Sequence, residues 1–317
     1  MANLYLGLQV VFPIMSFMAI GFLIRRIGWF TETTFNQLNT FVFQLLMPIL
    51  IITTIMAVPA AQLMSALNVQ LLLFSLAGIA VMVLISGLLC HYKIRDKAAR
   101  GVIIQGLYRS NLILYGVPAM LTIYDESKVG MISFLVIFII PIYNIIAAVV
   151  LGRSGEAKIS QRQMMGFVLR NPLVLGALLG ILANVLLRSL LPVIVVDSLR
   201  QIGMLATPMA FLILGGTMKV KNFGKDLPLL ALVCFVRLVL VPALALYLAI
   251  TLLGLSGPAL IVILGVFATP TAVNSYTMAK NMNIAPDLAG NLVVSSTLLS
   301  LFTLAGWITL LGALALL

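Results

Sequence analysis

The chain has 317 residues, of which 62% are apolar and only 9% are charged, and its mean hydropathy of +1.20 excludes an ordinary soluble domain. Nineteen Lys and Arg against eight Asp and Glu give a formal charge of +11, which in a membrane protein reports on orientation rather than on a nucleic-acid partner. Two cysteines in apolar stretches and a single histidine offer no disulfide framework and no zinc site, so we expect no metal and no cofactor.

Ten apolar stretches follow one another along the chain, each long enough to cross a bilayer core of about 30 Å. The first five cover residues 4–24, 36–57, 68–91, 99–123 and 130–151. The second five cover residues 171–190, 196–218, 227–251, 258–280 and 287–311. The first stretch has no basic residue before it and no cleavage site of small residues after it, so we expect it to be retained. The sequence therefore predicts an all-α integral membrane protein with ten transmembrane helices.

Basic residues are concentrated in alternate connections between these stretches. The connections after the first, third, fifth, seventh and ninth stretches hold fourteen Lys and Arg, whereas the other connections hold only Lys128, Arg188 and Arg200. Because cytoplasmic loops carry the excess of positive charge, this bias predicts a protein of the cytoplasmic (inner) membrane with both termini extracellular or periplasmic.

The longest polar connection, residues 152–170, lies at the midpoint and divides the chain into residues 1–151 and 171–317. Each part then holds five predicted helices. Because this number is odd, two repeats of this kind would be inverted relative to each other, which is the plan of many secondary transporters. We therefore expect two inverted five-helix repeats joined by a cytoplasmic loop.

Prolines interrupt corresponding helices of the two halves. The second helix of each half carries a proline near its middle, Pro48 or Pro208, and the fourth is interrupted at residues 116–118 or 268–271. One proline can be an ordinary kink, but matching interruptions predict broken fourth and ninth helices. Peptide groups freed at a break are tolerated only where they face protein or a water-filled cavity, so we expect an internal site.

The half-helices that begin at the two breaks would point their amide groups and positive dipole ends at an anion such as a carboxylate. Neutral hydrogen-bonding side chains surround both breaks, with Ser275 and Tyr276 close by. The predicted substrate site comprises Asn111, Tyr115, Gly116, Pro118, Pro270, Thr271 and Asn274.

Arg109 and Arg237 lie roughly 15 Å deep in their predicted spans, whereas all eight acidic residues fall in loops or at helix ends. Each arginine either reaches the headgroups or caps carbonyls freed at a break, or it supplies positive potential to an anionic substrate. We include both in the predicted site. The position of the acids argues against a proton relay of buried carboxylates. Sodium stays open as the coupling ion, because carbonyl, Asn and Thr oxygens can hold it.

These features favour a secondary carrier for small organic anions, with a channel or facilitator for anions or small solutes as the alternative. An intramembrane enzyme would need a nucleophile with a base, or a pair of membrane carboxylates, and the sequence favours neither arrangement.

Motifs along nearly the whole chain resemble the auxin efflux carrier family, which includes plant auxin carriers and bacterial permeases for malate and malonate. Residues 111–118 are similar to the family's Asn-to-Gly-x-Pro crossover segment, and Arg170-Asn171-Pro172 to its entry into the sixth helix. Residues 279–287 match its Ala-Lys-x-x-Asn-x-x-Pro-Asp run. The chain lacks the large central loop of the plant carriers, which favours a compact prokaryotic permease.

The resemblance implies a scaffold of helices 1, 2, 6 and 7 and a transport unit of helices 3–5 and 8–10 that move in a crossover-elevator mechanism. It also implies that Asn111 and the crossover of Pro118 and Pro270 contact the substrate carboxylate, and that the protein is a homodimer within membrane lipid. The choice of organic acid, the coupling ion and the direction of transport stay open.

Overall fold

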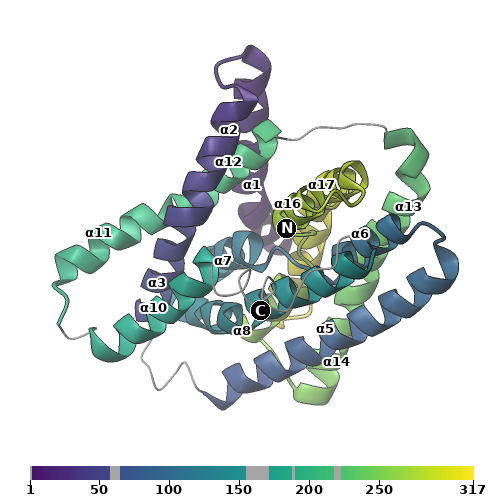
Figure 1. Cartoon of the computed structure of the whole chain (residues 1–317). Coiled ribbons are helices and arrows are strands. Elements are labelled where there is room, and N and C mark those ends of the chain that lie inside the picture. The colour runs from purple at the N-terminus through teal and green to yellow at the C-terminus, as the bar shows by residue number, and fades with distance from the viewer. Residues whose placement is uncertain (1, 58–64, 155–170, 188–189, 218–222) are drawn as a thin grey trace.

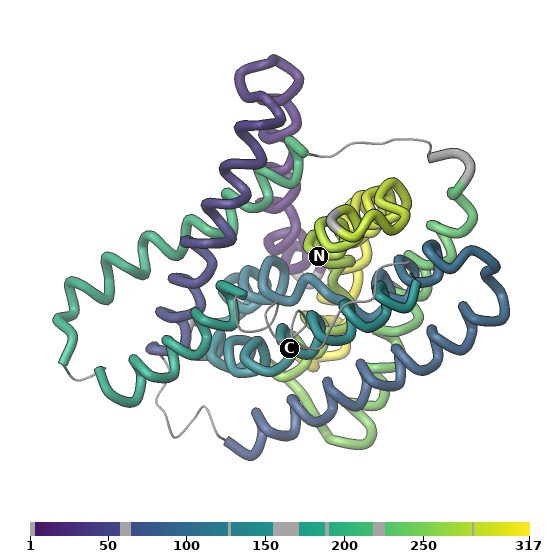
Figure 2. The backbone as a smooth tube through the Cα atoms, viewed as in Figure 1, coloured from purple at the N-terminus to yellow at the C-terminus, as the bar shows by residue number. Residues whose placement is uncertain are grey.

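The computed structural model describes residues 2–57, 65–154, 171–187, 190–217 and 223–317, and within these ranges the chain is built of helices (Figures 1 and 2). The first half contains α1 (Ala2–Ile27), α2 (Glu32–Phe41), η1 (Val42–Leu46), α3 (Met47–Ala57), α5 (Ala66–Lys93), α6 (Lys97–Tyr108), α7 (Leu112–Ile123) and α8 (Glu126–Ser154). The second half contains α10 (Pro172–Leu186), α11 (Val193–Met204), α12 (Ala206–Thr217), α13 (Phe223–Phe235), η2 (Val236–Leu240), α14 (Val241–Leu253), α15 (Pro258–Phe267), α16 (Val273–Asn281) and α17 (Pro286–Ala313). Residues 155–170 of the predicted central connection lie outside the described residues.

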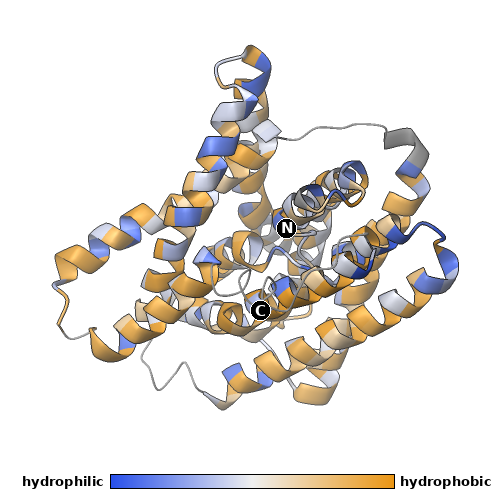
Figure 3. Ribbon diagram, in the orientation of Figure 1, coloured by the Kyte–Doolittle hydropathy of each residue, from blue (hydrophilic) through white to orange (hydrophobic). Residues whose placement is uncertain are grey.

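Seven described helical segments are long and apolar enough to cross a membrane, and α7, α10 and α15 are shorter apolar helices. Each of the ten predicted stretches overlaps one of these ten segments. Apolar residues line most of the helical surface, and polar residues gather near helix ends and connections (Figure 3). The all-helical membrane architecture is therefore confirmed for the described residues, and the crossing of a bilayer by all ten stretches stays a prediction.

Local sequence signals account for several helix ends. Asp96 caps α6 by accepting hydrogen bonds from the backbone amides of Ala98 and Ala99. Asn171 caps α10 through the amide of Leu173, and Pro172 occupies the first turn, where no amide hydrogen is needed. These helices therefore begin where their capping residues place them.

Both predicted interruptions of the second helices are confirmed. A π-helical turn, η1, comes immediately before α3, whose second residue is Pro48. α11 ends at Met204 and α12 begins at Ala206, two residues before Pro208. Each proline removes one backbone donor from the preceding turn, and the chain responds with an irregular turn there.

The helices pack into two groups that position the site. The frame group consists of α1, α2, η1, α3, α10, α11 and α12, and the crossover group consists of α5–α8 and α13–α17. In the frame group, α1 and α12 are in backbone contact, because a Cβ placed on Gly21 would lie 1.8 Å from the carbonyl oxygen of Leu212. α1 also packs along α17, so this helix pair joins the two groups.

α15 lies at the centre of the crossover group. Every residue from Ala259 to Phe267 is buried, so this short helix is apolar on all sides and surrounded by protein. α7 packs directly against it. The two half-helices therefore lie inside the protein, as expected for a helix whose end exposes backbone groups.

The fourth predicted helix is broken, but not at the predicted place. α6 ends at Tyr108 and α7 begins at Leu112, so the break falls at residues 109–111, and Pro118 lies inside α7. The expectation of a break at 116–118 is wrong, because α7 tolerates the proline as an interior residue while tertiary pairing opens the chain earlier. The break at residues 268–271 is confirmed, since α15 ends at Phe267 and α16 begins at Val273.

Candidate functional site

The two breaks meet and pair with each other through their backbones. Ser110 and Thr271 form an antiparallel bridge. The amide of Asn111 donates to the carbonyl of Pro270 at 3.0 Å, and the amide of Ala272 donates to the carbonyl of Arg109 at 3.1 Å. Each break thus satisfies peptide groups that the other leaves without helical partners. We call this paired segment, residues 109–111 and 269–272, the crossover.

Two helices begin at the crossover without a side-chain cap. Asn111 is the N-cap of α7 and Ala272 is the N-cap of α16, and neither side chain bonds to a first-turn amide. The Nδ2 atom of Asn111 is buried and makes no hydrogen bond within the described part of the protein. First-turn amides and a positive dipole end are therefore presented at both helix starts, beside an amide donor that has no protein partner.

A small cavity of about 30 Å³ lies at these helix starts. Arg109 and Asn111 line it from the crossover and Asn274 from α16, and Phe43 and Tyr143 contribute to its wall. A volume of this size holds about two water molecules. It also suits a group as small as a carboxylate, but it is too small for a whole organic acid.

A larger cavity of about 490 Å³ lies between the frame group and the crossover group. Arg25, Asn36 and Thr217 line it from the frame side, and Tyr276 and Lys280 from the crossover side. Glu32 of α2 and Asp287 and Asn291 of α17 also line it. Val273, the first residue of α16, borders both cavities.

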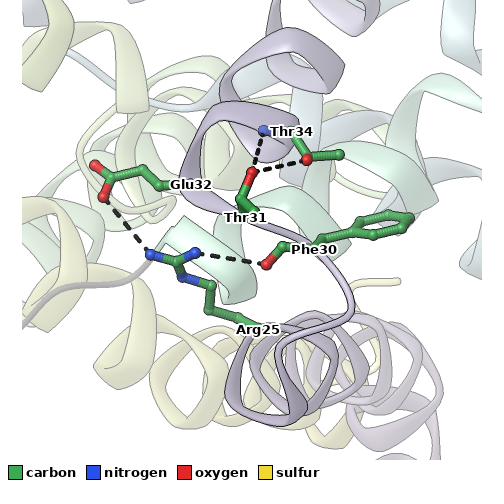
Figure 4. A network of polar contacts seen from close by, with 5 residues as sticks. All are labelled: Arg25, Phe30, Thr31, Glu32 and Thr34. Carbon is green, nitrogen blue, oxygen red and sulfur yellow. Dashed lines mark hydrogen bonds and ion pairs between the residues drawn. The ribbon is translucent and has the colours of Figure 1, made fainter.

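A polar network braces the frame side of the larger cavity (Figure 4). Arg25 Nη2 lies 3.6 Å from Glu32 Oε2, and Arg25 Nη1 donates to the carbonyl of Phe30 at 3.5 Å. Thr31 caps α2 by accepting from the amide of Thr34 at 3.2 Å. Because both charged side chains are at least a third exposed, their ion pair contributes only about 0–1 kcal/mol. Its effect is to hold the α1–α2 connection at the cavity wall.

Arg109 is 3% exposed and links the break between α6 and α7 to two further helices of the crossover group. Its Nη2 donates to Asn144 Oδ1 on α8 at 2.6 Å, and its Nη1 donates to Met278 Sδ on α16 at 2.9 Å. The guanidinium therefore combines a bracing role with a place on the wall of the small cavity.

Arg237 caps backbone carbonyls and lines neither of the two cavities. It is 1% exposed and donates from Nε to Thr269 O at 3.1 Å, from Nη1 to Leu107 O at 2.7 Å, and from Nη2 to Val266 O at 3.2 Å. Of the two interpretations drawn from the sequence, the geometry supports the cap at a helix break.

The other predicted residues lie in the crossover or beside it and line neither cavity. Thr271 Oγ1 donates to Gly106 O at 2.9 Å, and Pro270 supplies the carbonyl that pairs with Asn111. Tyr115 packs edge-on against Phe211, with ring centroids 5.1 Å apart. Gly116 faces Gly265 where α7 passes α15, and a Cβ on Gly116 would lie 3.6 Å from Gly265 Cα. Contact of these residues with substrate stays a prediction.

Several cavity residues were absent from the predicted site, namely Arg25, Asn36, Lys280, Asp287 and Asn291. Lys280 and Asp287 belong to the run at residues 279–287 that carries the family resemblance, and this was the available signal. Nothing in the local sequence brings Asn36 close to Asn291, because their meeting depends on how the two helix groups pack.

A comparison with protein-family models finds a match over residues 7–308 to the membrane transport protein family. A comparison with curated proteins finds no match. The family is one of transporters and not of enzymes, in agreement with a multi-pass helical chain whose two broken helices enclose an internal polar site. The chain belongs to the membrane transport protein family, the family of the auxin efflux carriers.

Proposed function

We propose that the protein is a secondary transporter of small organic anions, carboxylates such as malate or malonate or auxin-like acids. The observation that carries this proposal is the pair of uncapped helix starts at the crossover, together with the unpartnered Nδ2 atom of Asn111. A carboxylate accepts hydrogen bonds, and this site offers it donors from the first-turn amides and from Nδ2.

The charges around the crossover favour an anion. Arg109 and Arg237 are buried there, and no Asp or Glu is buried among the described residues. A buried positive charge without an acidic partner raises the potential felt at the small cavity, most directly from Arg109, which lines it. Hydrogen bonds from such a site to a carboxylate are worth about 1.5–3 kcal/mol each.

The larger cavity gives the substrate a route and a place for its body. Its volume lies within the roughly 300–1,000 Å³ of ordinary small-molecule sites. Its wall carries the cations Lys280 and Arg25 beside the carboxylates of Glu32 and Asp287, and Val273 borders both this cavity and the small one. In this arrangement the carboxylate binds at the helix starts while the rest of the acid occupies the larger cavity.

We infer an elevator mechanism in which the crossover group moves against the frame group as one unit. The contact between α1 and α17 supports this mechanism. The two backbones approach closely near one end of the pair, because a Cβ on Gly7 would lie 2.6 Å from Ala305 O. Near the other end of the pair, Arg25 and Asp287 line the larger cavity. This geometry fits a state open on one side only. Ten spans, inverted repeats and a homodimer in lipid belong to the same proposal.

Counterflow in proteoliposomes tests the proposal. Vesicles preloaded with unlabelled malate or malonate should take up the labelled acid faster than empty vesicles, because a carrier exchanges substrate across one site. Uptake that does not respond to preloading would indicate the alternative, a channel or facilitator. A thermal-shift screen of mono- and dicarboxylates and their amides selects the acid, since a ligand that binds only the folded state raises the unfolding temperature. Absence of any carboxylate response would contradict anion transport.

A further inference from the structure

Three backbone carbonyl oxygens converge beside the crossover. Leu107 O belongs to the last turn of α6, Val266 O to the last turn of α15, and Thr269 O to the segment that follows α15. These oxygens carry the negative ends of two helix dipoles. The potential at this location is therefore negative, whereas it is positive at the helix starts beside Asn111 and Val273.

Local chemistry explains why these oxygens have no helical donor. Val266 O would accept from the amide four residues later, but that residue is Pro270, which has no amide hydrogen. Leu107 O would accept from Asn111, but the amide of Asn111 pairs with Pro270 O instead. The crossover thus creates a set of carbonyl acceptors that must be satisfied from elsewhere.

One guanidinium satisfies all three oxygens. Arg237 lies on the π-helical turn η2, which comes between α13 and α14. Three of its nitrogens donate to the three oxygens over 2.7–3.2 Å, and the side chain is 1% exposed. No Asp or Glu is buried in the described part of the chain. The negative ends of the two helices therefore balance the buried positive charge of Arg237.

Carbonyl oxygens from helix ends and unwound backbone form the ligand set with which transporters coordinate Na⁺. We propose that Arg237 occupies a latent Na⁺ site at the crossover, so that its tethered guanidinium supplies the positive charge that a bound ion would otherwise bring. Two consequences follow. The wild-type crossover is complete without Na⁺, and removal of the guanidinium opens an oxygen-lined site that Na⁺ can enter.

The test compares unfolding temperatures of purified full-length protein at equal ionic strength in sodium, potassium and choline chloride. Wild type should unfold at the same temperature in all three salts. Arg237→Ala should unfold about 5 °C lower or more in choline, because three buried carbonyls lose their donors. Sodium should restore a clear part of that loss, and low millimolar guanidinium should restore more. Urea, which has a similar shape without the charge, should restore none.

Arg109→Ala is the matched control. It also removes a buried arginine at the crossover, but Arg109 bonds to the side chains of Asn144 and Met278 rather than to helix-end carbonyls. Its loss of stability should be the same in sodium and choline. If Arg237→Ala does not fold, Arg237→Gln and Arg237→Lys carry the test, since the first removes the charge and should become sodium-dependent while the second keeps it and should not.

Three results would overturn the proposal. The first is a wild type that unfolds at a higher temperature in sodium than in choline. The second is an Arg237→Ala or Arg237→Gln variant whose unfolding temperature is restored by no cation, or by guanidinium alone. The third is an Arg109→Ala variant that responds to Na⁺ as Arg237→Ala does. The readout is protein stability without substrate, so it is independent of whether the protein carries organic anions.

Discussion

Asn111 combines two tasks that sequence patterns treat separately. Its backbone amide pairs with Pro270 O across the crossover, and its carbonyl accepts from Tyr115 to begin α7. Its side chain lines the small cavity, and Nδ2 has no hydrogen-bond partner among the described residues. Because the backbone alone builds the crossover here, the side chain can be changed without dismantling it.

We therefore expect Asn111→Ala to weaken carboxylate binding while leaving the unfolding temperature nearly unchanged. Loss of a hydrogen bond to a charged group costs about 1.5–3 kcal/mol, or roughly ten- to a hundred-fold in affinity. Asn111→Asp keeps the shape and adds a negative charge, so it should reduce binding of the acid more than binding of its amide. Isothermal titration measures both. Unchanged affinity in Asn111→Ala would remove Asn111 from the site.

Lys280 is expected to act at longer range. It is exposed on the wall of the larger cavity, with Nζ 5.8 Å from the ring centroid of Tyr276. Lys280→Gln should raise KM for a dicarboxylate at low ionic strength and have a smaller effect at high salt, because exposed charges are screened. Lys97→Gln, which removes an exposed lysine that lines neither cavity, is the control. Equal effects of the two changes would assign the loss to overall charge.

At the scale of elements, the broken helices show what a sequence can and cannot predict. The break at 268–271 was predictable because Pro270 removes the amide that Val266 needs. The break at 109–111 has no such mark, since it depends on pairing with a segment about 160 residues away. Pro118 gave a local signal of equal strength and was absorbed within α7. Proline therefore indicates where a helix can break, and tertiary pairing decides where it does.

The α1–α12 contact gives a prediction about helix packing. Gly21→Ala would place a Cβ 1.8 Å from Leu212 O, and a backbone oxygen cannot rotate away. We expect a loss of about 1–3 kcal/mol in stability, visible as a lower unfolding temperature. Gly87→Ala in α5 meets nothing within 4 Å and should be neutral or slightly stabilising, because alanine favours helix. Similar results for the two variants would contradict the close packing of α1 and α12.

At the scale of the whole molecule, hydropathy predicted the apolar stretches well, because a segment's suitability to span a bilayer depends on its own residues and not on distant ones. The candidate site was predicted less completely. Arg109, Asn111 and Asn274 do line the small cavity, but the larger cavity forms between helix groups, and no local pattern encodes that packing. Residues such as Asn36 and Asn291 could be found only from the folded chain.

The charge bias predicts which ends of the molecule face the cytoplasm. A single cysteine at position 160, outside the described residues, should resist an impermeant thiol reagent applied to intact cells. A cysteine at Leu190, which is 73% exposed between α10 and α11, should react. The native Cys90 and Cys234 are buried and free, and replacing them with alanine removes background. Labelling at position 160 with protection at 190 would reverse the orientation.

The two buried arginines also make the proposed motion sensitive to membrane potential. Both belong to the crossover group, so these arginines would contribute two formal positive charges to the empty unit as it moves through the field, at about 2.3 kcal/mol per charge per 100 mV. A bound dianion cancels that charge. An inside-negative potential would then draw the empty unit back toward the cytoplasm and leave the loaded step nearly unaffected, which favours export. We expect export of a labelled dianion from vesicles to accelerate when a potassium diffusion potential makes their interior negative.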